Sequence, residues 1–326
     1  MEKLKKIASV LLQKTKIALI CHINPDGDTV GSALALYGAL RVLGIEADLL
    51  SADPIGDKLK YLPFCNRFNT ANQVLNEGTP QPYEAAVIID AGDKSRVGTM
   101  SATFDAAEIK ICIDHHKTHT LKCDYMYVDP EKAATAEIIY TLIKEFPVDC
   151  LTREVATNLF AGILTDSGCF TYPSVTAETH KVAAELYGYG IDAAEIAYHV
   201  FKKKTKPAFL LAGKALGNTR FFKNDTIGVV TFFLNDFAET GTGMDETDGI
   251  VNTVQSIDTV KAAIAITEAD KTHYKVSIRT KEPVDASDIA GEFGGGGHRL
   301  AAGCRIAGVY EDVVERLVKA AGDRIV

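Results

Sequence analysis

The sequence has no tryptophan, only seven cysteines, and no apolar run close to the roughly 18–20 residues that cross a bilayer. A membrane-spanning helix is therefore not expected. Residues 1–6 are charged and only a short apolar stretch follows, so no secretory signal is expected either. The cysteine number is odd and no CxxC pair occurs, which predicts reduced thiols and a cytoplasmic location.

An excess of positive charge is also lacking. The 326 residues include 35 basic and 43 acidic side chains, for a formal net charge of −8. A chain without a broad positive field is a poor partner for a long nucleic-acid duplex. The balance does not exclude a small phosphorylated ligand, because a few local groups and cations are enough to hold one.

Hydrophobic periodicity divides the chain into two folded parts. After an amphipathic helix at 2–13, apolar strands alternate with helices, and this alternation predicts an α/β domain with a parallel sheet over residues 1–188. Residues 189–214 are expected to form a helical connector, and residues 215–326 a smaller α+β domain. The strands expected in the first domain are 17–21, 47–50, 85–89 and 111–113, with helices 29–43, 131–145 and 152–164. Those expected in the second are 219–234, 260–268 and 273–280, with helices 247–255 and 310–321.

Acidic and imidazole residues follow several of these elements. Ligands of open parallel sheets bind at the carboxyl ends of the strands, so these side chains are expected to meet at one edge. A cluster of four carboxylates there would repel itself, and divalent cations relieve that repulsion. Mixed Asp and His donors favour Mn²⁺, with Mg²⁺ or Zn²⁺ as alternatives. The residues are His22, Asn24, Asp26 and Asp28 after the first strand, Asp90 after the third, Asp114, His115 and His116 after the fourth, and Asp166 after helix 152–164.

Several of these residues also have a structural interpretation: Asp90 and Asp166, each taken alone, fit polar loop residues, whereas the His115-His116 pair is harder to explain in this way. Asp28 is a candidate N-cap for a helix that begins at Thr29, and Asp26-Gly27 is a common turn sequence. An EF-hand is excluded, because the sixth loop position lacks glycine and Ala35 occupies the glutamate position.

The ordered motifs resemble those of the DHH phosphoesterase superfamily. HxxxDxD at 22–28, Asp90, Asp114-His115-His116 and Asp166 match its four N-terminal motifs in order. Near the C-terminus, the GGGHRLAAG sequence at 295–303 is similar to the signature of the DHHA1 domain, and Ser277-Ile278-Arg279 resembles its substrate-binding strand. The resemblance implies a catalytic DHH domain followed by a substrate-binding DHHA1 domain.

The glycine run at 294–297 has several interpretations of its own. A flexible hinge is one; a Walker loop is excluded because no Lys-Ser/Thr follows, and the late position argues against a dinucleotide-binding loop. Taken alone the run favours the hinge; the functional interpretation is an anion nest, in which backbone N–H groups of Gly295, Gly296 and Gly297 converge on a phosphate. His298 and Arg279 are expected to clamp the same group by charge-assisted hydrogen bonds.

The resemblance also implies roles for the acidic and imidazole residues. It assigns one metal ion to His22, Asp26 and Asp90, and a second to Asp28, Asp90, His115 and Asp166. The two ions would share a hydroxide that attacks phosphorus. His116 is then the candidate to stabilise the phosphoryl oxygens or assist the leaving group, and Asp114 to fix the histidine rings. Asn24 and Arg96 are candidates for phosphate contacts, with loop roles as alternatives, and His119 is expected to be a loop residue.

Within the superfamily, the chain resembles the compact oligoribonuclease/pAp phosphatase type, since no residues remain for an OB-fold or sensory domain. The implied substrates are very short RNAs and 3′-phosphoadenosine 5′-phosphate (pAp), which would be converted to AMP. A soluble cyclic- or linear-dinucleotide phosphodiesterase is the alternative enzyme, and a nucleotide-binding sensor is the alternative without catalysis. The resemblance is compatible with a homodimer, and the sequence does not determine the oligomeric state.

Overall fold

In the computed structural model, the chain divides into two compact units, Met1–Lys203 and Lys204–Val326. The structure describes residues 2–70, 83–247 and 249–325. The division falls inside the predicted connector, and the three-part division at 188 and 214 remains a proposal. Among the described helices, none is both long enough and apolar enough to cross a membrane.

The first unit is built on the predicted parallel sheet. Its six strands are ordered β3-β2-β1-β4-β5-β6, and every neighbouring pair is parallel. The central strand β1 is apolar on both faces: Ile17 and Leu19 enter one core and Ala18 and Ile20 the other. Strands buried on both faces are typical of parallel sheets that helices cover on each side. The strands are β1 Lys16–Ile20, β2 Glu46–Ser51, β3 Phe68–Thr70, β4 Ala85–Ile89, β5 Ile109–Asp114 and β6 Tyr125–Val128.

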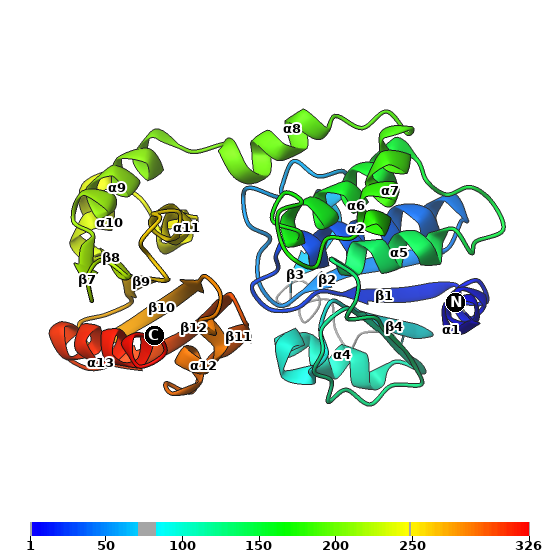
Figure 1. Cartoon of the computed structure of the whole chain (residues 1–326). Coiled ribbons are helices and arrows are strands. Elements are labelled where there is room, and N and C mark those ends of the chain that lie inside the picture. The colour runs from blue at the N-terminus through cyan, green and yellow to red at the C-terminus, as the bar shows by residue number, and fades with distance from the viewer. Residues whose placement is uncertain (1, 71–82, 248, 326) are drawn as a thin grey trace. The chain divides into compact units, whose positions relative to one another are not determined.

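Helices cover both faces of this sheet (Figure 1), with α2, α5 and α6 on one face and α4 on the other. The first face holds the larger core. The helical elements are α1 Glu2–Leu11, α2 Gly27–Val42, η1 Cys65–Arg67, η2 Lys94–Met100, α4 Ser101–Ala106, α5 Thr135–Ile143, α6 Arg153–Asp166, α7 Ala177–Tyr187, α8 Ala193–Ala197 and η3 Tyr198–Lys202.

Helices α2 and α6 approach each other closely through two glycines. A Cβ added to Gly31 of α2 would lie 2.4 Å from the carbonyl oxygen of Asn158 in α6, and one added to Gly162 of α6 would lie 3.0 Å from Oδ1 of Asp28 in α2. The helices run antiparallel, because a Cβ on Gly27 at the start of α2 would meet Thr165 near the end of α6. This contact brings the first turn of α2 to the last turn of α6.

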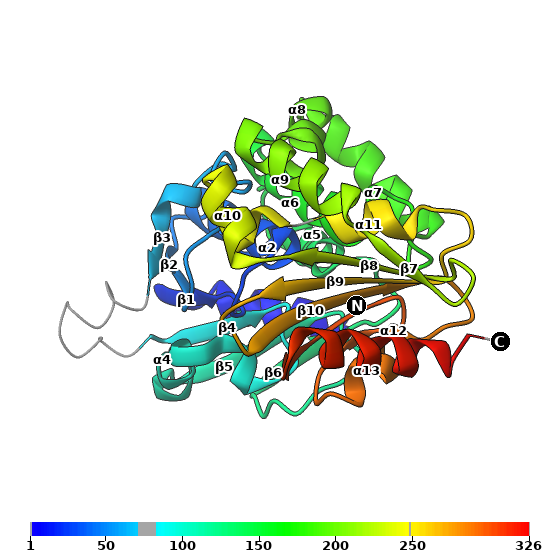
Figure 2. The same ribbon diagram turned by 90° about the vertical axis from the view of Figure 1, so that its left-hand side faces the viewer.

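The second unit contains a mixed sheet, β11-β12-β10-β9-β8-β7, in which only β8 and β9 run parallel. Helices α12 and α13 pack on one face, and α9, α10 and α11 on the other (Figure 2). This confirms the predicted fold class. Its elements are α9 Lys206–Gly217, β7 Arg220–Phe222, β8 Ile227–Phe232, α10 Leu234–Thr240, η4 Met244–Thr247, α11 Ile250–Gln255, β9 Ala262–Glu268, β10 His273–Thr280, α12 Ala286–Gly291, β11 Gly296–His298, β12 Ala301–Ala307 and α13 Tyr310–Gly322.

Three of the expected elements differ in the structure. The predicted strand 219–234 is a hairpin of β7 and β8, because Lys223, Asn224 and Asp225 all adopt positive φ and turn the chain. The predicted helix 131–145 begins only at Thr135. Helix α2 begins at Gly27 rather than Thr29, so the N-cap is Asp26, and the interpretation of Asp28 as the cap is wrong.

Candidate metal centre and phosphate-binding face

The strand order of the first unit predicts where its site lies. The chain leaves the central strands β1 and β4 in opposite lateral directions, and ligands bind at such a switch point, beyond the carboxyl ends of the strands. His22 follows β1 and Asp90 follows β4, so both side chains lie at this point. Asp114 ends β5 on the far side of β4, and His115 and His116 follow it.

One group of donors consists of His22, Asp26 and Asp90. The Nε2 atom of His22 lies 3.5 Å from Oδ2 of Asp26 and 3.5 Å from Oδ2 of Asp90. The Nδ1 atom of His22 is 2.8 Å from the carbonyl oxygen of Ile23, an arrangement that aims Nε2 at the carboxylates. Asp26 serves two purposes, because its Oδ1 accepts the N–H groups of Asp28 and Thr29 at the start of α2.

A second group consists of Asp28, His115 and Asp166. The Nε2 atom of His115 lies 4.0 Å from Oδ2 of Asp28 and 3.2 Å from Oδ2 of Asp166. Asp28 is in the first turn of α2 and Asp166 is the last residue of α6, so the close contact of these helices brings the two carboxylates together.

Asp90 connects the two groups. Its Oδ2 faces His22, while its Oδ1 lies 3.6 Å from Nε2 of His115. The Asp90 backbone is left-handed, with φ 64°, a conformation that aspartate tolerates better than most residues and that is often found at functional sites. Asp90 therefore presents one carboxylate oxygen to each group.

The clustered carboxylates favour the binding of positive charge, as the pKa values of their neighbours show. Burial, together with the nearby carboxylates of Asp90 and Asp166, raises the pKa of Asp28 well above its usual value. Burial alone would lower the pKa of His22, but Asp26 and Asp90 outweigh it and raise this pKa to about 10. The same competition at His115, where Asp166, Asp28 and Asp90 are the partners, raises the pKa to about 11. Protons or divalent cations can supply this charge.

The donor atoms fit divalent cations. His22 Nε2 is buried and makes no hydrogen bond with any described residue. The contacts of 3.2–4.0 Å within the cluster are short enough for one ion to reach both atoms, since two ligands with bonds of about 2.1 Å are at most ~4.2 Å apart. The side chains of Asp26 and Asp166 are 54% and 34% exposed, whereas Asp28 and Asp90 are buried, so both groups open toward solvent. A divalent metal centre of mixed Asp/His donors is therefore chemically reasonable here.

Asp114 holds the DHH segment in shape. Its Oδ1 accepts the backbone N–H groups of His115 and His116 and lies 2.7 Å from Nδ1 of His116. His119 occupies the loop as expected, but its Nδ1 lies 3.6 Å from Oδ2 of Asp114, and its Nε2 is 2.5 Å from the carbonyl oxygen of His116. Asp114 therefore contacts the rings of His116 and His119, whereas the His115 ring meets the carbonyl oxygen of Lys132 instead.

The two candidate phosphate contacts near the centre have evident structural functions. Asn24 is exposed, has φ 50°, and donates its N–H to Oδ2 of Asp53 at 2.7 Å. Arg96 accepts the N–H of Ile23 at its carbonyl oxygen, at 2.6 Å, which ties the loop after β4 to the loop after β1. These contacts involve the backbones and leave the proposed phosphate roles of both side chains untested.

In the second unit, Arg279 and His298 lie in one row of the sheet. Ala301 of β12 pairs with Arg279 of β10 on one side and with His298 of β11 on the other. Directly paired residues share a face, so the small Ala301 side chain separates the two larger ones. The neighbouring residues Ile278 and Ala302 point to the other face of the sheet, into the core formed with α12 and α13. The row therefore lies on the face opposite α12 and α13.

The predicted anion nest needs correction. The N–H groups of Gly294 and Gly295 donate to the carbonyls of Gly291 and Ala290 at the end of α12, so neither is available to a phosphate. Gly296 and Gly297 belong to the edge strand β11, and their phosphate contacts stay a prediction. A Cβ on Gly295 would lie 2.2 Å from the carbonyl oxygen of Gly303, which explains why this position needs glycine.

No sequence pattern indicates Thr135 and Lys132, although both contact the centre. Thr135 donates its backbone N–H to Asp28 and its hydroxyl to Asp90, and the carbonyl of Lys132 is 3.1 Å from Nδ1 of His115. The sequence signal for Thr135 is that it is a polar residue at the start of an otherwise apolar helix. To use this signal, the first residue of the helix must be predicted without error, and the predicted helix begins at 131 rather than 135.

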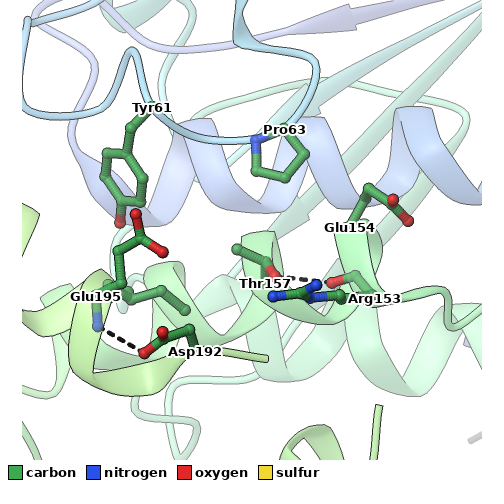
Figure 3. Close-up of a pocket in the computed structure, with 8 residues that line it drawn as sticks. Tyr61, Pro63, Arg153, Glu154, Thr157, Asp192 and Glu195 are labelled. Atoms are coloured by element: carbon green, nitrogen blue, oxygen red, sulfur yellow. Dashed lines mark hydrogen bonds between the residues drawn. The ribbon is translucent and has the colours of Figure 1, made fainter. Parts of the chain in front are cut away.

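A cavity of about 290 Å³ lies elsewhere on the first unit (Figure 3). It is lined by Tyr61, Pro63, Arg153, Glu154, Thr157, Asp192, Glu195 and Ile196. Arg153 begins α6 and Asp166 ends it, so the length of the helix, about 20 Å, separates the cavity from the centre. None of the site residues expected from the sequence is among its lining residues.

Comparison with known proteins identifies both parts of the chain. The N-terminal domain of the DHH family matches residues 16–163, and the DHHA1 domain matches residues 226–326. "Bifunctional oligoribonuclease and PAP phosphatase NrnA" of Thermus thermophilus is 32% identical over 326 residues, which cover 99% of this chain and 95% of that relative. A "probable manganese-dependent inorganic pyrophosphatase" of Bacillus licheniformis is 27% identical over 182 residues, 55% of this chain and 57% of the relative.

A solved structure supports the fold. An exopolyphosphatase-related protein from Bacteroides fragilis superposes with a TM-score of 0.93 at 24% identity, covering 99% of this chain and 96% of that one. The matching domains, the full-length relative and the motif residues at the strand ends agree. The chain belongs to the DHH family, carries a DHHA1 domain after its DHH domain, and is a hydrolase that acts on phosphoester bonds.

Proposed function

We propose that the chain hydrolyses short oligoribonucleotides and the 3′-phosphate of pAp with the help of two divalent cations. The observation that carries the proposal is the position of Asp90, whose two carboxylate oxygens face different donor groups. A single ion would need only one of the groups. Two groups that share a carboxylate are the arrangement expected of a two-metal site.

In this proposal one cation is held by His22, Asp26 and Asp90, and the other by Asp28, Asp90, His115 and Asp166. Bound cations would offset the charge of a phosphoryl group in transit and lower the pKa of a water molecule. The donors are two imidazoles and four carboxylates, a set that suits Mn²⁺ and also Mg²⁺. The manganese-dependent relative supports the choice of Mn²⁺.

His116 is proposed to act on the phosphoryl group or on the leaving oxygen. Its Nδ1 is engaged by Asp114, which fixes the plane of the ring, and this assigns the substrate contact to Nε2. An imidazole held in this way can donate a hydrogen bond to a phosphoryl oxygen or a proton to the departing oxygen.

Arg279 and His298 are proposed to bind substrate phosphate. Both side chains can donate charge-assisted hydrogen bonds, and the small Ala301 between them leaves room for a tetrahedral anion. Arg279 also donates to the carbonyl of Ile278 at 3.0 Å, which restrains its guanidinium group. The N–H groups of Gly294 and Gly295 already donate to carbonyl oxygens of α12. Arg279 and His298 are therefore proposed to contribute more to phosphate binding than the sequence predicts.

The test is a substrate panel assayed with Mn²⁺: pAp, the dinucleotides pApA and pGpG, a trinucleotide, a five-nucleotide RNA and cyclic-di-AMP. Release of AMP from pAp and of mononucleotides from the RNAs is the expected result. A strong preference for cyclic-di-AMP or for pGpG would instead favour a dinucleotide phosphodiesterase. Binding of pAp without any Mn²⁺-dependent product would contradict the proposal and favour a sensor.

A further inference from the structure

The segment that begins helix α5 contacts donors of both groups. We propose that Thr135 is a positioning residue that sets the orientation of Asp28 and Asp90, and so couples the two cation sites. The inference rests on the metal centre proposed above. Thr135 is fully buried, and it donates its backbone N–H to Oδ2 of Asp28 at 2.6 Å and its hydroxyl to Oδ1 of Asp90 at 2.8 Å.

The backbone donors explain how a buried carboxylate is held at Asp28. The N–H groups of Thr135 and Ala136 lie in the first turn of α5, where a helix offers N–H groups without internal partners. They bind one oxygen each, with Ala136 donating to Oδ1 at 2.9 Å, and the hydroxyl of Ser32 also donates to Oδ1 at 3.2 Å. The carboxylate plane is therefore fixed at both oxygens.

The hydroxyl of Thr135 fixes Asp90 in a different way. Its single proton goes to Oδ1, the oxygen that faces His115, and none goes to Oδ2, which faces His22. A threonine side chain is stiff about χ1 because its Cβ is branched, so the direction of the donor is well defined. The rotation of the Asp90 carboxylate, and with it the assignment of one oxygen to each group, follows from this bond.

Residues 132–136 are held in place by contacts on the side away from the metal-ligand candidates. The buried carboxylate of Glu137 accepts the N–H of Ala133 at 3.2 Å and the hydroxyl of Thr179, in α7, at 2.9 Å. Between these points, the carbonyl of Lys132 meets Nδ1 of His115. Residues 132–136 therefore contact Asp28, Asp90 and His115, and a second helix fixes their position.

The experiment compares Thr135→Val, which removes the hydroxyl but keeps the branched shape, with Thr135→Ser, which restores it. Metal-free full-length protein is titrated with Mn²⁺ by calorimetry, and thermal unfolding is followed with and without Mn²⁺. Thr135→Val is expected to weaken at least one Mn²⁺ site by ~10–100-fold, the usual effect of losing an outer partner of a metal ligand, while Thr135→Ser stays near wild type.

The matched control is Thr141→Val in the same helix, since the Thr141 hydroxyl donates to the carbonyl of Glu137 and touches no donor of the centre. Wild-type affinity and stoichiometry in Thr135→Val would overturn the inference. If that variant does not fold, Thr135→Ala removes the same hydroxyl and is judged by the same criterion. Failure of the wild-type protein to bind Mn²⁺ would instead refute the proposed metal centre.

Discussion

The imidazole of His116 is hydrogen-bonded to Asp114, with 2.7 Å between Nδ1 and Oδ1. The same oxygen accepts two backbone N–H groups, so one buried carboxylate oxygen organises the whole DHH turn. Among the described residues, Asp114 belongs to neither donor group. Its effect on the reaction should therefore be transmitted through the histidines.

Asp114→Asn keeps the shape of the side chain but replaces a charged acceptor with a neutral amide. We expect kcat to fall by ~10–100-fold, because the His116 ring loses the partner that orients it. Steady-state kinetics on pAp with saturating Mn²⁺ measure the effect. A change confined to KM would contradict the role assigned to His116.

Asp90→Asn removes charge from both donor groups at once. Asparagine is preferred to alanine for this test, because it tolerates the left-handed backbone that the position requires. Activity should fall by more than the ~100-fold that loss of an outer partner costs, and the Mn²⁺ stoichiometry should drop. Near-normal turnover in this variant would refute the two-metal proposal.

Arg279→Ala should raise KM for pAp by ~10–100-fold, because a hydrogen bond to a charged group contributes about 1.5–3 kcal/mol. Turnover at saturation should change little, since Arg279 is proposed to bind phosphate rather than to act on the bond that breaks. Arg316→Ala is the control: this exposed arginine is on α13, which covers the opposite face of the sheet. A fall in kcat without a change in KM would argue against the binding role.

The raised pKa values of His22 and His115 predict how Mn²⁺ binding depends on pH. With pKa values of about 10 and 11, both imidazoles are protonated at neutral pH in the metal-free protein. A cation binds neutral imidazole, so it must displace these protons, and Mn²⁺ affinity should increase as pH rises. Calorimetry in buffers of different ionisation enthalpy would detect the released protons. Affinity independent of pH between about pH 6 and pH 8 would contradict this prediction.

Gly31→Ala should destabilise the first unit. The added Cβ would lie 2.4 Å from the carbonyl oxygen of Asn158, so α2 and α6 must move apart, at a cost of about 1–3 kcal/mol in the free energy of unfolding. Gly213→Ala, in helix α9, is the matched control, because its Cβ meets nothing within 4 Å. There the helix propensity of alanine should stabilise the protein by up to about 1 kcal/mol. Chemical denaturation of both variants tests the contrast.

Much of the fold could be predicted because its signals are local. Ala85–Ile89 is fully buried and reads as a strand, and the acidic and imidazole residues follow such strands directly. Strand β6, Tyr125–Val128, has no comparable signal, because all four residues are only half-buried. In β11 and β12, small residues replace the apolar alternation that predicts a strand.

The unpredicted part of the centre depends on contacts between distant segments. Thr135 lies 45 positions from Asp90 in the sequence, and their hydrogen bond exists only because α5 begins beside the end of β4. The role of His119 likewise follows from the path of a loop across Gly92, where a Cβ would lie 2.7 Å from the His119 ring. Neither contact has a periodicity or spacing that a single sequence could reveal.

The close approach of α2 and α6 has a further consequence for how this centre could be altered. Asp28 and Asp166 sit on the two helices, and a Cβ on Gly162 would come within 3.0 Å of Oδ1 of Asp28. The distance between the carboxylates of Asp28 and Asp166 therefore depends on two buried glycines, Gly31 and Gly162, that set how closely the helices pack. Engineering for a cation of different radius would begin at Gly31 and Gly162, with every ligand left in place.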